Sequence, residues 1–204
     1  MKIDPADLGR QQSHDLIGSC IAPLPVVFIS SIGRDGVFNA APFSFAAPVC
    51  SKPPVLCVSF GLRHGEKKDT LKNIEFTQDF VVNVVDENLL PKALKTSADY
   101  PSDVDEMKEA GLTAVPSEKV SSPRIAESKV NLECRLVQKL ELVEELRDGK
   151  GLRAIVFGEV IMAHVKDEVW VDGKIDPSRL ANVARLGSDM YYGKAGLYKL
   201  ERPK

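Results

Sequence analysis

Short apolar runs rich in β-branched residues recur along the chain, and they constrain its fold more than any other feature. The clearest of these runs are residues 25–32, 54–60, 80–85, 130–136 and 154–162. Each is shorter than a buried helix and is bounded by polar or turn-forming residues, which is typical of buried strands. In the run 130–136 apolar and polar residues alternate, as expected for a strand with one buried face. We therefore expect a core built from strands.

Glycine residues punctuate these runs at positions that predict turns and bends. The tetrapeptide Gly33-Arg34-Asp35-Gly36 follows the first run, and its Asp-Gly pair favours a hairpin into residues 37–39. Gly158 interrupts the run 154–162, where we expect a bulge or a bend of a barrel. Two shorter strands are expected at 169–171 and 197–200.

Helical patterns are fewer. Helices are predicted at 69–74, 87–96 and 103–110, and Asp69 is expected to cap the first of them. The least regular segment, 97–124, is expected to form an insertion beside the core. Many strands with few helices indicate a mainly β protein, a β barrel or sandwich with helical excursions. A length of 204 residues fits a single domain over 1–204.

Charge and composition exclude several classes of protein. The chain has 27 Lys and Arg against 29 Asp and Glu, a net charge of −2, so we expect no nucleic-acid partner. The longest apolar stretch, 21–32, contains two prolines and is too short to span a bilayer, so we expect no membrane association. The N-terminal residues are polar and unlike a secretory signal, which favours the cytoplasm. The four cysteines lack metal-binding spacing, so we expect free thiols and no metal.

Motifs for common catalytic and nucleotide sites are missing from the sequence. Neither a glycine-rich dinucleotide fingerprint nor a phosphate-binding loop of the Walker type is present. The three histidines, His14, His64 and His164, lie far apart in sequence and are not accompanied by a nucleophile elbow. The sequence thus predicts no constellation of catalytic side chains.

Two segments are richer in polar and small residues than a plain strand and turn require. In residues 39–45, Asn39 and Ser44 can hydrogen-bond a planar polar ring or a phosphate, and small neighbours let a ligand approach the backbone. Residues 59–70 run from a strand end through a glycine-containing loop with several cations to the start of a helix, which favours an anion site. From the residue types alone, an edge strand and a solvated loop explain these segments equally well.

Short motifs follow one another in order along nearly the whole chain. They are the Asp-Gly turn with the segment 39–45, Lys52-Pro53-Pro54-Val55, the segment 63–70 with Asn73-Ile74, Phe80-Val81-Val82-Asn83, Asp105-Glu106 with Gly111-Leu112, Leu132-Glu133-Cys134, Gly158-Glu159-Val160, and Arg185-Leu186-Gly187 before Tyr191. Together they make the sequence similar to the flavin reductase-like family of FMN-binding split β-barrels. The similarity is to the branch that includes flavoredoxins and the reductase components of two-component oxygenases.

This resemblance implies a function and a set of binding residues. It implies a homodimer that holds FMN near the subunit interface, and an oxidoreductase in which NADH or NADPH reduces the flavin. The electrons would pass to free flavin, a partner oxygenase, ferric iron or a small redox protein. The alternatives are a flavin-binding or carrier protein with little turnover, and a β-barrel module that binds no flavin. The implied ring-side residues are Asn39, Ala41, Ser44 and Phe45. The implied phosphate-side residues are Ser59, Arg63, Lys68 and Thr70, and a C-terminal element that covers the flavin or donor site contributes Arg185 and Tyr191. No catalytic side chain is implied, because the hydride chemistry belongs to the flavin.

Some other polar and aromatic residues have plain structural interpretations. His164 is expected to pack on a strand rather than to line a donor site, and His14 is expected at the surface. Trp170, at a strand end before a turn, is expected to lie partly in the core. The acidic residues of the third predicted helix are expected on its solvated face; they are Asp103, Asp105, Glu106 and Glu109.

Overall fold

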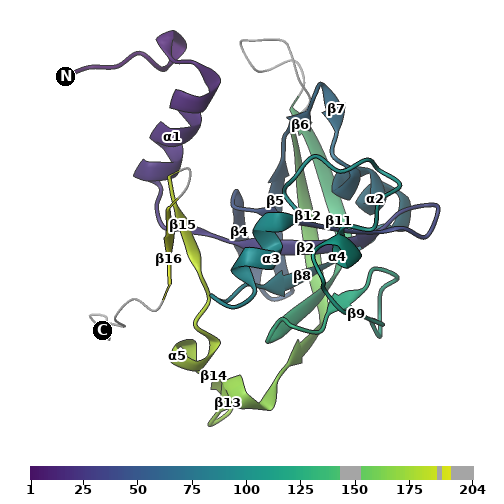
Figure 1. The fold of residues 1–204 in the computed structure, drawn as a ribbon. Coiled ribbons are helices and arrows are strands. Elements are labelled where there is room, and N and C mark those ends of the chain that lie inside the picture. The colour runs from purple at the N-terminus through teal and green to yellow at the C-terminus, as the bar shows by residue number, and fades with distance from the viewer. Residues whose placement is uncertain (143–152, 188–189, 194–204) are drawn as a thin grey trace.

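A seven-stranded antiparallel sheet is the centre of the molecule. The computed structural model describes residues 1–142, 153–187 and 190–193 (Figure 1). The strand order in the large sheet is β3-β2-β8-β11-β12-β5-β4. In that order the strands are Phe38–Phe43, Val27–Ile32, Asp79–Val84, Val130–Leu142, Arg153–Val165, Pro54–Phe60 and Ala46–Ser51.

The chain connection between the two edge strands shows that this sheet curls into a barrel. The edge strands β3 and β4 are consecutive in sequence and are joined only by Ser44 and Phe45. Two linking residues span at most about 11 Å between the flanking Cα atoms. In a flat sheet the first and seventh strands would lie roughly 29 Å apart. The sheet must therefore bring its edges together at this point, and the expected mainly β barrel is confirmed.

Apolar side chains fill the barrel, and a helix closes one end of it. Phe80, Val58 and Cys134 point inward and are fully buried. The nine-residue helix α2 (Asp69–Thr77) adds Leu71 and Ile74 to the same cluster. This packing fixes the N-terminus of α2 at the rim of the barrel.

Gly158 lies on β12 where the ladder with β11 is irregular, as the sequence predicts. The register shifts by one residue beside the Leu136–Gly158 pair, so Val137 on β11 is the extra residue of the bulge. A Cβ at Gly158 would lie 2.5 Å from Cζ of Phe80. Glycine is needed here because the Phe80 ring packs directly against the backbone.

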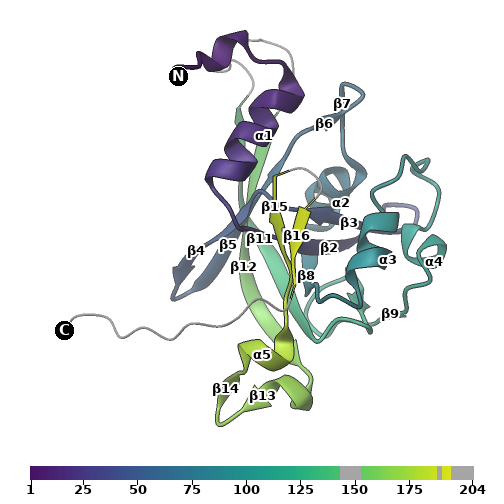
Figure 2. The same cartoon turned by 60° about the vertical axis from the view of Figure 1, so that its left-hand side comes forward.

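A second core lies on the other face of β2 and β3. Phe28 and Ala40 are fully buried there against Ala93 of α3 (Leu90–Lys95) and Met107 of α4 (Glu106–Glu109). Figure 1 and Figure 2 both show α3 and α4 together beside the barrel.

The predicted helices exist, but their bounds differ. The first is longer than expected because α2 continues to Thr77 and ends at Gln78 in the left-handed region. The second is shorter because Asp86 Oδ1 accepts the N–H groups of Asn88 and Leu89 in a turn before α3. The third begins late because Asp105 caps it, accepting the N–H of Lys108 at 3.1 Å.

The expected insertion beside the barrel, 97–124, is confirmed as mostly irregular. It contains α4 and the short strand β9 (Ala114–Val115), which pairs with β10 (Arg124–Ile125). Two buried carboxylates fasten it. Asp79 accepts the N–H groups of residues 121 and 122, and Glu133 accepts those of residues 118 and 119. His164, which packs on β12 as predicted, is 2.6 Å from Glu133 through Nε2.

Several elements lie outside the barrel. The 3-10 turn η1 (Pro5–Asp7) and helix α1 (Arg10–Cys20) precede it, and α1, which the sequence analysis missed, lies next to a three-stranded sheet in both views (Figure 2). That sheet has the order β1-β15-β16, with β1 Leu24–Pro25, β15 Ala184–Leu186 and β16 Met190–Tyr192.

The segment after β12 forms a 3-10 turn, a small hairpin and a short helix, namely η2 (Asp167–Val169), β13 (Trp170–Val171), β14 (Lys174–Ile175) and α5 (Pro177–Leu180). Trp170, which was expected to lie partly in the core, is 51% exposed, because the hairpin carries it away from the barrel. The predicted strand 197–200 lies outside the described residues. In the part of the chain that the structure describes, no helix is long and apolar enough to cross a membrane.

Candidate functional site

A cleft of about 380 Å³ opens at the rim of the barrel, between β3, the start of α2 and the loop that follows α3. Five of the ten predicted binding residues line it: Asn39, Ala41, Arg63, Lys68 and Thr70. Its other lining residues are Pro42, Leu62, His64, Asp69, Thr96, Ser97, Asp99 and Glu106. The two polar segments that the sequence analysis singled out therefore meet at one place.

A two-residue hairpin turn presents Arg63 to this cleft. The strands β6 (Leu62–Arg63) and β7 (Glu66–Lys67) are joined by His64 and Gly65, which have φ angles of 50° and 84°. Two successive positive φ angles are typical of the tight turns that connect antiparallel strands, and glycine supplies the second of them here. The turn directs Arg63 toward the loop after α3.

Arg63 is held by that loop. Its Nε and Nη2 atoms contact Oδ1 of Asp99, and Nη2 also donates to the carbonyl oxygen of Ala98 at 2.7 Å. Oδ2 of Asp99 lies 2.9 Å from Nε2 of His64. Hydrogen bonds from His64 and Arg63 lower the pKa of Asp99, so its carboxyl group is ionised at neutral pH.

The N-terminus of α2 forms another wall of the cleft. Asp69 was expected to cap this helix, but Lys68 occupies the cap position and Asp69 is the first helical residue. Asp69 is engaged elsewhere, because its Oδ1 accepts from Lys72 Nζ at 3.1 Å and from Ser102 Oγ at 3.0 Å. Nζ of Lys68 lies 5.1 Å from the centre of the Phe43 ring.

Glu106 is a site residue that the sequence analysis misjudged. It was expected on a solvated helix face, yet it is only 5% exposed. Its Oε2 accepts from Asn39 Nδ2 at 2.6 Å and from the backbone N–H of Ala40 at 3.0 Å. Asn39 in turn accepts the hydroxyl hydrogen of Thr70 at 2.8 Å. Helical periodicity could not reveal this, because α4 is a single turn that packs its first residue against β3.

The environment of Glu106 disfavours its charge. Burial raises the pKa of Glu106 from 4.5 to about 7, although the N–H of Ala40, the charge of Arg63 and the amide of Asn39 oppose this effect. The nearby charge of Asp69 raises it further. Glu106 is therefore a carboxyl group that changes protonation near neutral pH.

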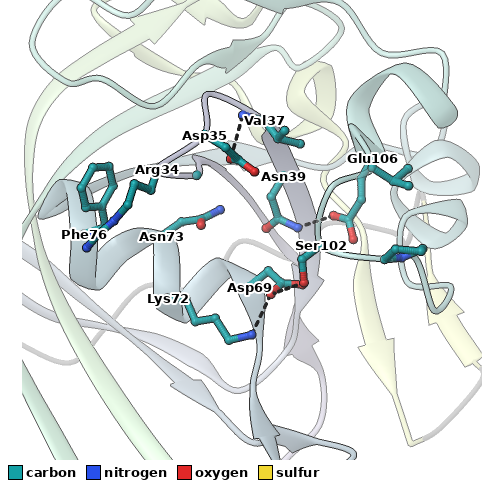
Figure 3. A pocket seen from close by; sticks show the side chains of 13 residues that line it. Arg34, Asp35, Val37, Asn39, Asp69, Lys72, Asn73, Phe76, Ser102 and Glu106 are labelled. Carbon is teal, nitrogen blue, oxygen red and sulfur yellow. Dashed lines mark hydrogen bonds and ion pairs between the residues drawn. The ribbon is translucent and has the colours of Figure 1, made fainter.

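A second cleft, of about 460 Å³, adjoins the first and shares Asn39, Asp69 and Glu106 with it (Figure 3). The guanidinium carbon of Arg34 lies 4.8 Å from the centre of the Phe76 ring on its rim. The hydrogen bond between Asn39 and Glu106 is thus part of the wall between two open spaces.

The other five predicted residues line neither of these two clefts. Ser44 and Phe45 link β3 to β4, and the ring of Phe45 stacks on that of His14 with 5.5 Å between their centres. His14, expected at the surface, is half-buried by this contact. The N–H of Ser59 donates to the carbonyl of Phe45 at 2.8 Å, so Ser59 lies beside the ring-side segment. Arg185 and Tyr191 face each other across β15 and β16.

All four cysteines lie among the described residues, and each is a free thiol. Burial raises the pKa of Cys134 to about 12, so this thiol is not a nucleophile at neutral pH. Within the described ranges, no three His, Cys, Asp or Glu side chains are grouped so as to hold a metal ion.

Comparisons with known proteins agree with this fold. A family model described as flavin reductase like domain matches residues 19–178. An uncharacterized protein of Halalkalibacterium halodurans is 36% identical over 205 residues, which cover 100% of this chain and 97% of that protein. The crystal structure of nitrilotriacetate monooxygenase component B from Bacillus cereus is 29% identical, with a TM-score of 0.92 over 98% of both chains. The 2-nitrobenzoate 2-nitroreductase of Pseudomonas fluorescens is 27% identical, with a TM-score of 0.86 over 100% of this chain and 96% of that chain.

Proposed function

This chain belongs to the flavin reductase-like family of split β-barrels, and we propose that it is an FMN-binding oxidoreductase in which NADH or NADPH reduces the flavin. The observation that carries the proposal is the cleft of about 380 Å³ in which Arg63 and Lys68 meet the N-terminus of α2. A cleft of this size is in the range of small-ligand sites.

The phosphate group of FMN would bind at the end of the cleft that Arg63 and Lys68 line. A phosphate monoester carries a charge near −2, and a guanidinium group can bind it with two parallel hydrogen bonds. The first N–H groups of α2 have no partner within the helix, and the helix dipole favours an anion there. The hydroxyl hydrogen of Thr70 is donated to Asn39, so Thr70 would act through its place in the first turn of α2 and by fixing Asn39.

The flavin ring would extend along β3 from Ala41 toward Ser44 and Phe45. The small side chains of Ala41 and Ser44 would leave the backbone open there to a planar ligand. Backbone N–H groups of this segment would stabilise the negative charge that the ring gains on reduction. Ser59, next to Phe45, and the Arg185–Tyr191 pair are proposed as further contacts. When bound, FMN would supply the hydride chemistry, while the protein supplies orientation and electrostatics.

We further propose that the protein is a homodimer. The edge strand β4 exposes five of its six residues, among them Val49. Helix α1 exposes Ile17, and Ile21, directly after the helix, is exposed as well. Exposed apolar groups next to an open sheet edge favour coverage by another protein surface. Since the chain resembles a monooxygenase component B, a partner oxygenase is a candidate electron acceptor, beside free flavin and small redox proteins.

The phosphate site is tested by replacing Arg63 and Thr70 with alanine in one variant. We expect at least tenfold weaker FMN binding, because the variant loses the guanidinium and the residue that fixes Asn39. Isothermal titration calorimetry with FMN measures the effect. A matched control is Arg135→Ala, which removes an exposed arginine paired with Glu159 on the barrel wall and should leave the affinity unchanged. Equal FMN affinity of the double variant and the wild type would contradict the proposed phosphate site.

A further inference from the structure

Asp99 occupies a position that conflicts with tight binding of a phosphate. It lies in the loop after α3, its side chain is 66% exposed, and it lines the same cleft as Arg63 and Lys68. Its Oδ1 contacts Nε and Nη2 of Arg63, and its Oδ2 lies 2.9 Å from His64. One exposed carboxylate thus contacts both Arg63 and His64 in the cleft.

These contacts use one edge of the guanidinium group. The Nε and Nη2 atoms form an edge that can hold a carboxylate or a phosphate with two hydrogen bonds, and here Asp99 and the carbonyl oxygen of Ala98 occupy it. A phosphate could use this edge only by displacing Asp99. On the remaining edge it would lie beside the ionised carboxylate, and two like charges in one cleft oppose each other.

The other two carboxylates that line the cleft are not free to respond in this way. Asp69 is held by Lys72 and Ser102, and Glu106 is buried against β3. Asp99 differs because its side chain is mostly exposed and contacts Arg63 and His64, which line the cleft. It can turn toward water when another anion takes its place.

We propose that Asp99 is an internal competitor for the phosphate group of the flavin, which weakens FMN binding and speeds its release. This inference rests on the proposed function, because it assumes that the phosphate binds beside Arg63. Asp99 would control the affinity for the ligand. Its pairing with Arg63 would therefore do more than hold the loop after α3 in place.

The test compares wild type with Asp99→Asn, which keeps the size of the side chain and removes its charge. We expect Asp99→Asn to bind FMN about fivefold more tightly, the effect of one exposed charge pair, mainly through slower dissociation. Riboflavin, which lacks the phosphate, should bind both proteins equally, and this result also shows that the variant is folded. Stopped-flow fluorescence gives the rates. Asp103→Asn, an exposed carboxylate in the same segment, serves as the control and should match the wild type.

Each outcome has a distinct meaning. Unchanged or weaker FMN binding by Asp99→Asn, with clear binding by wild type, would overturn the competitor role and indicate that Asp99 orients Arg63. An equal gain for riboflavin would also overturn it, since the phosphate would then not be the group that competes. Failure of both proteins to bind FMN would refute the proposed function itself, and this inference with it.

Discussion

Replacing Glu106 by glutamine should stabilise the protein at neutral pH. The pKa of Glu106 rises from 4.5 in the unfolded chain to about 7 in the folded protein, because burial disfavours its charge. Between these two values the unfolded chain has released the proton and the folded protein has not. Stability is therefore fully present below pH 4.5 and is lost as the pH rises toward 7.

The size of this loss follows from the two pKa values. The difference between 4.5 and about 7 corresponds to about 3 kcal/mol of unfolding free energy at pH 7. Glutamine does not titrate, and its side-chain oxygen can still accept from Asn39 and from the N–H of Ala40. We expect Glu106→Gln to match wild type at pH 4 and to exceed its stability by about 3 kcal/mol at pH 7.

Urea unfolding at several pH values, followed by circular dichroism, measures the difference between variant and wild type. The difference should grow between pH 4.5 and pH 7 and then stay constant. Glu109→Gln, an exposed carboxyl group on the same helix, is the control and should show no such change. A pH-independent difference would refute the reasoning, because Glu106 would then not have a raised pKa in the folded protein. A variant less stable than wild type at pH 7 would also refute it, because the buried carboxylate would then be a favourable charged acceptor.

Other predictions concern the barrel interior and the thiols. Gly158→Ala, whose methyl group would meet the Phe80 ring at 2.5 Å, should lower the unfolding free energy by about 1–3 kcal/mol; wild-type stability in urea unfolding would contradict this packing. Cys134, whose pKa burial raises to about 12, should resist iodoacetamide in the native protein while the exposed Cys50 is alkylated. Rapid labelling of Cys134, detected by peptide mass spectrometry, would show an open barrel. Single Ser or Ala replacements of Cys50, Cys57 and Cys134 should leave flavin reduction intact, whereas its loss in a folded, flavin-loaded variant would indicate a redox thiol.

The barrel could be predicted from sequence because its signals are local. The run 54–60 and the Asp-Gly turn at residues 35–36 carry the strand and hairpin patterns directly, and the structure has β5 at Pro54–Phe60 and a hairpin around Gly36. Helix α1 was missed because Arg10–Cys20 is mostly polar and has no marked apolar face, so its sequence is similar to that of a loop.

The candidate site could be predicted only in part. One polar segment of the sequence holds Arg63, Lys68 and Thr70, and another holds Asn39 and Ala41. The structure brings all five residues into one cleft. The burial of Glu106 depends on how α4 packs on β3, and the pairing of Asp99 with Arg63 joins residues 36 positions apart. Neither contact has a periodic or local signal, because each is set by tertiary packing.

The visible absorption spectrum of the purified protein, before and after anaerobic addition of NADH or NADPH, tests the central claim most directly. The account predicts flavin bands, from bound or added FMN, that bleach when the nicotinamide is added. Bands that persist with both nicotinamides would contradict the reductase activity and favour a flavin carrier. A colourless protein that fails to bind added FMN would contradict the proposed flavin site altogether.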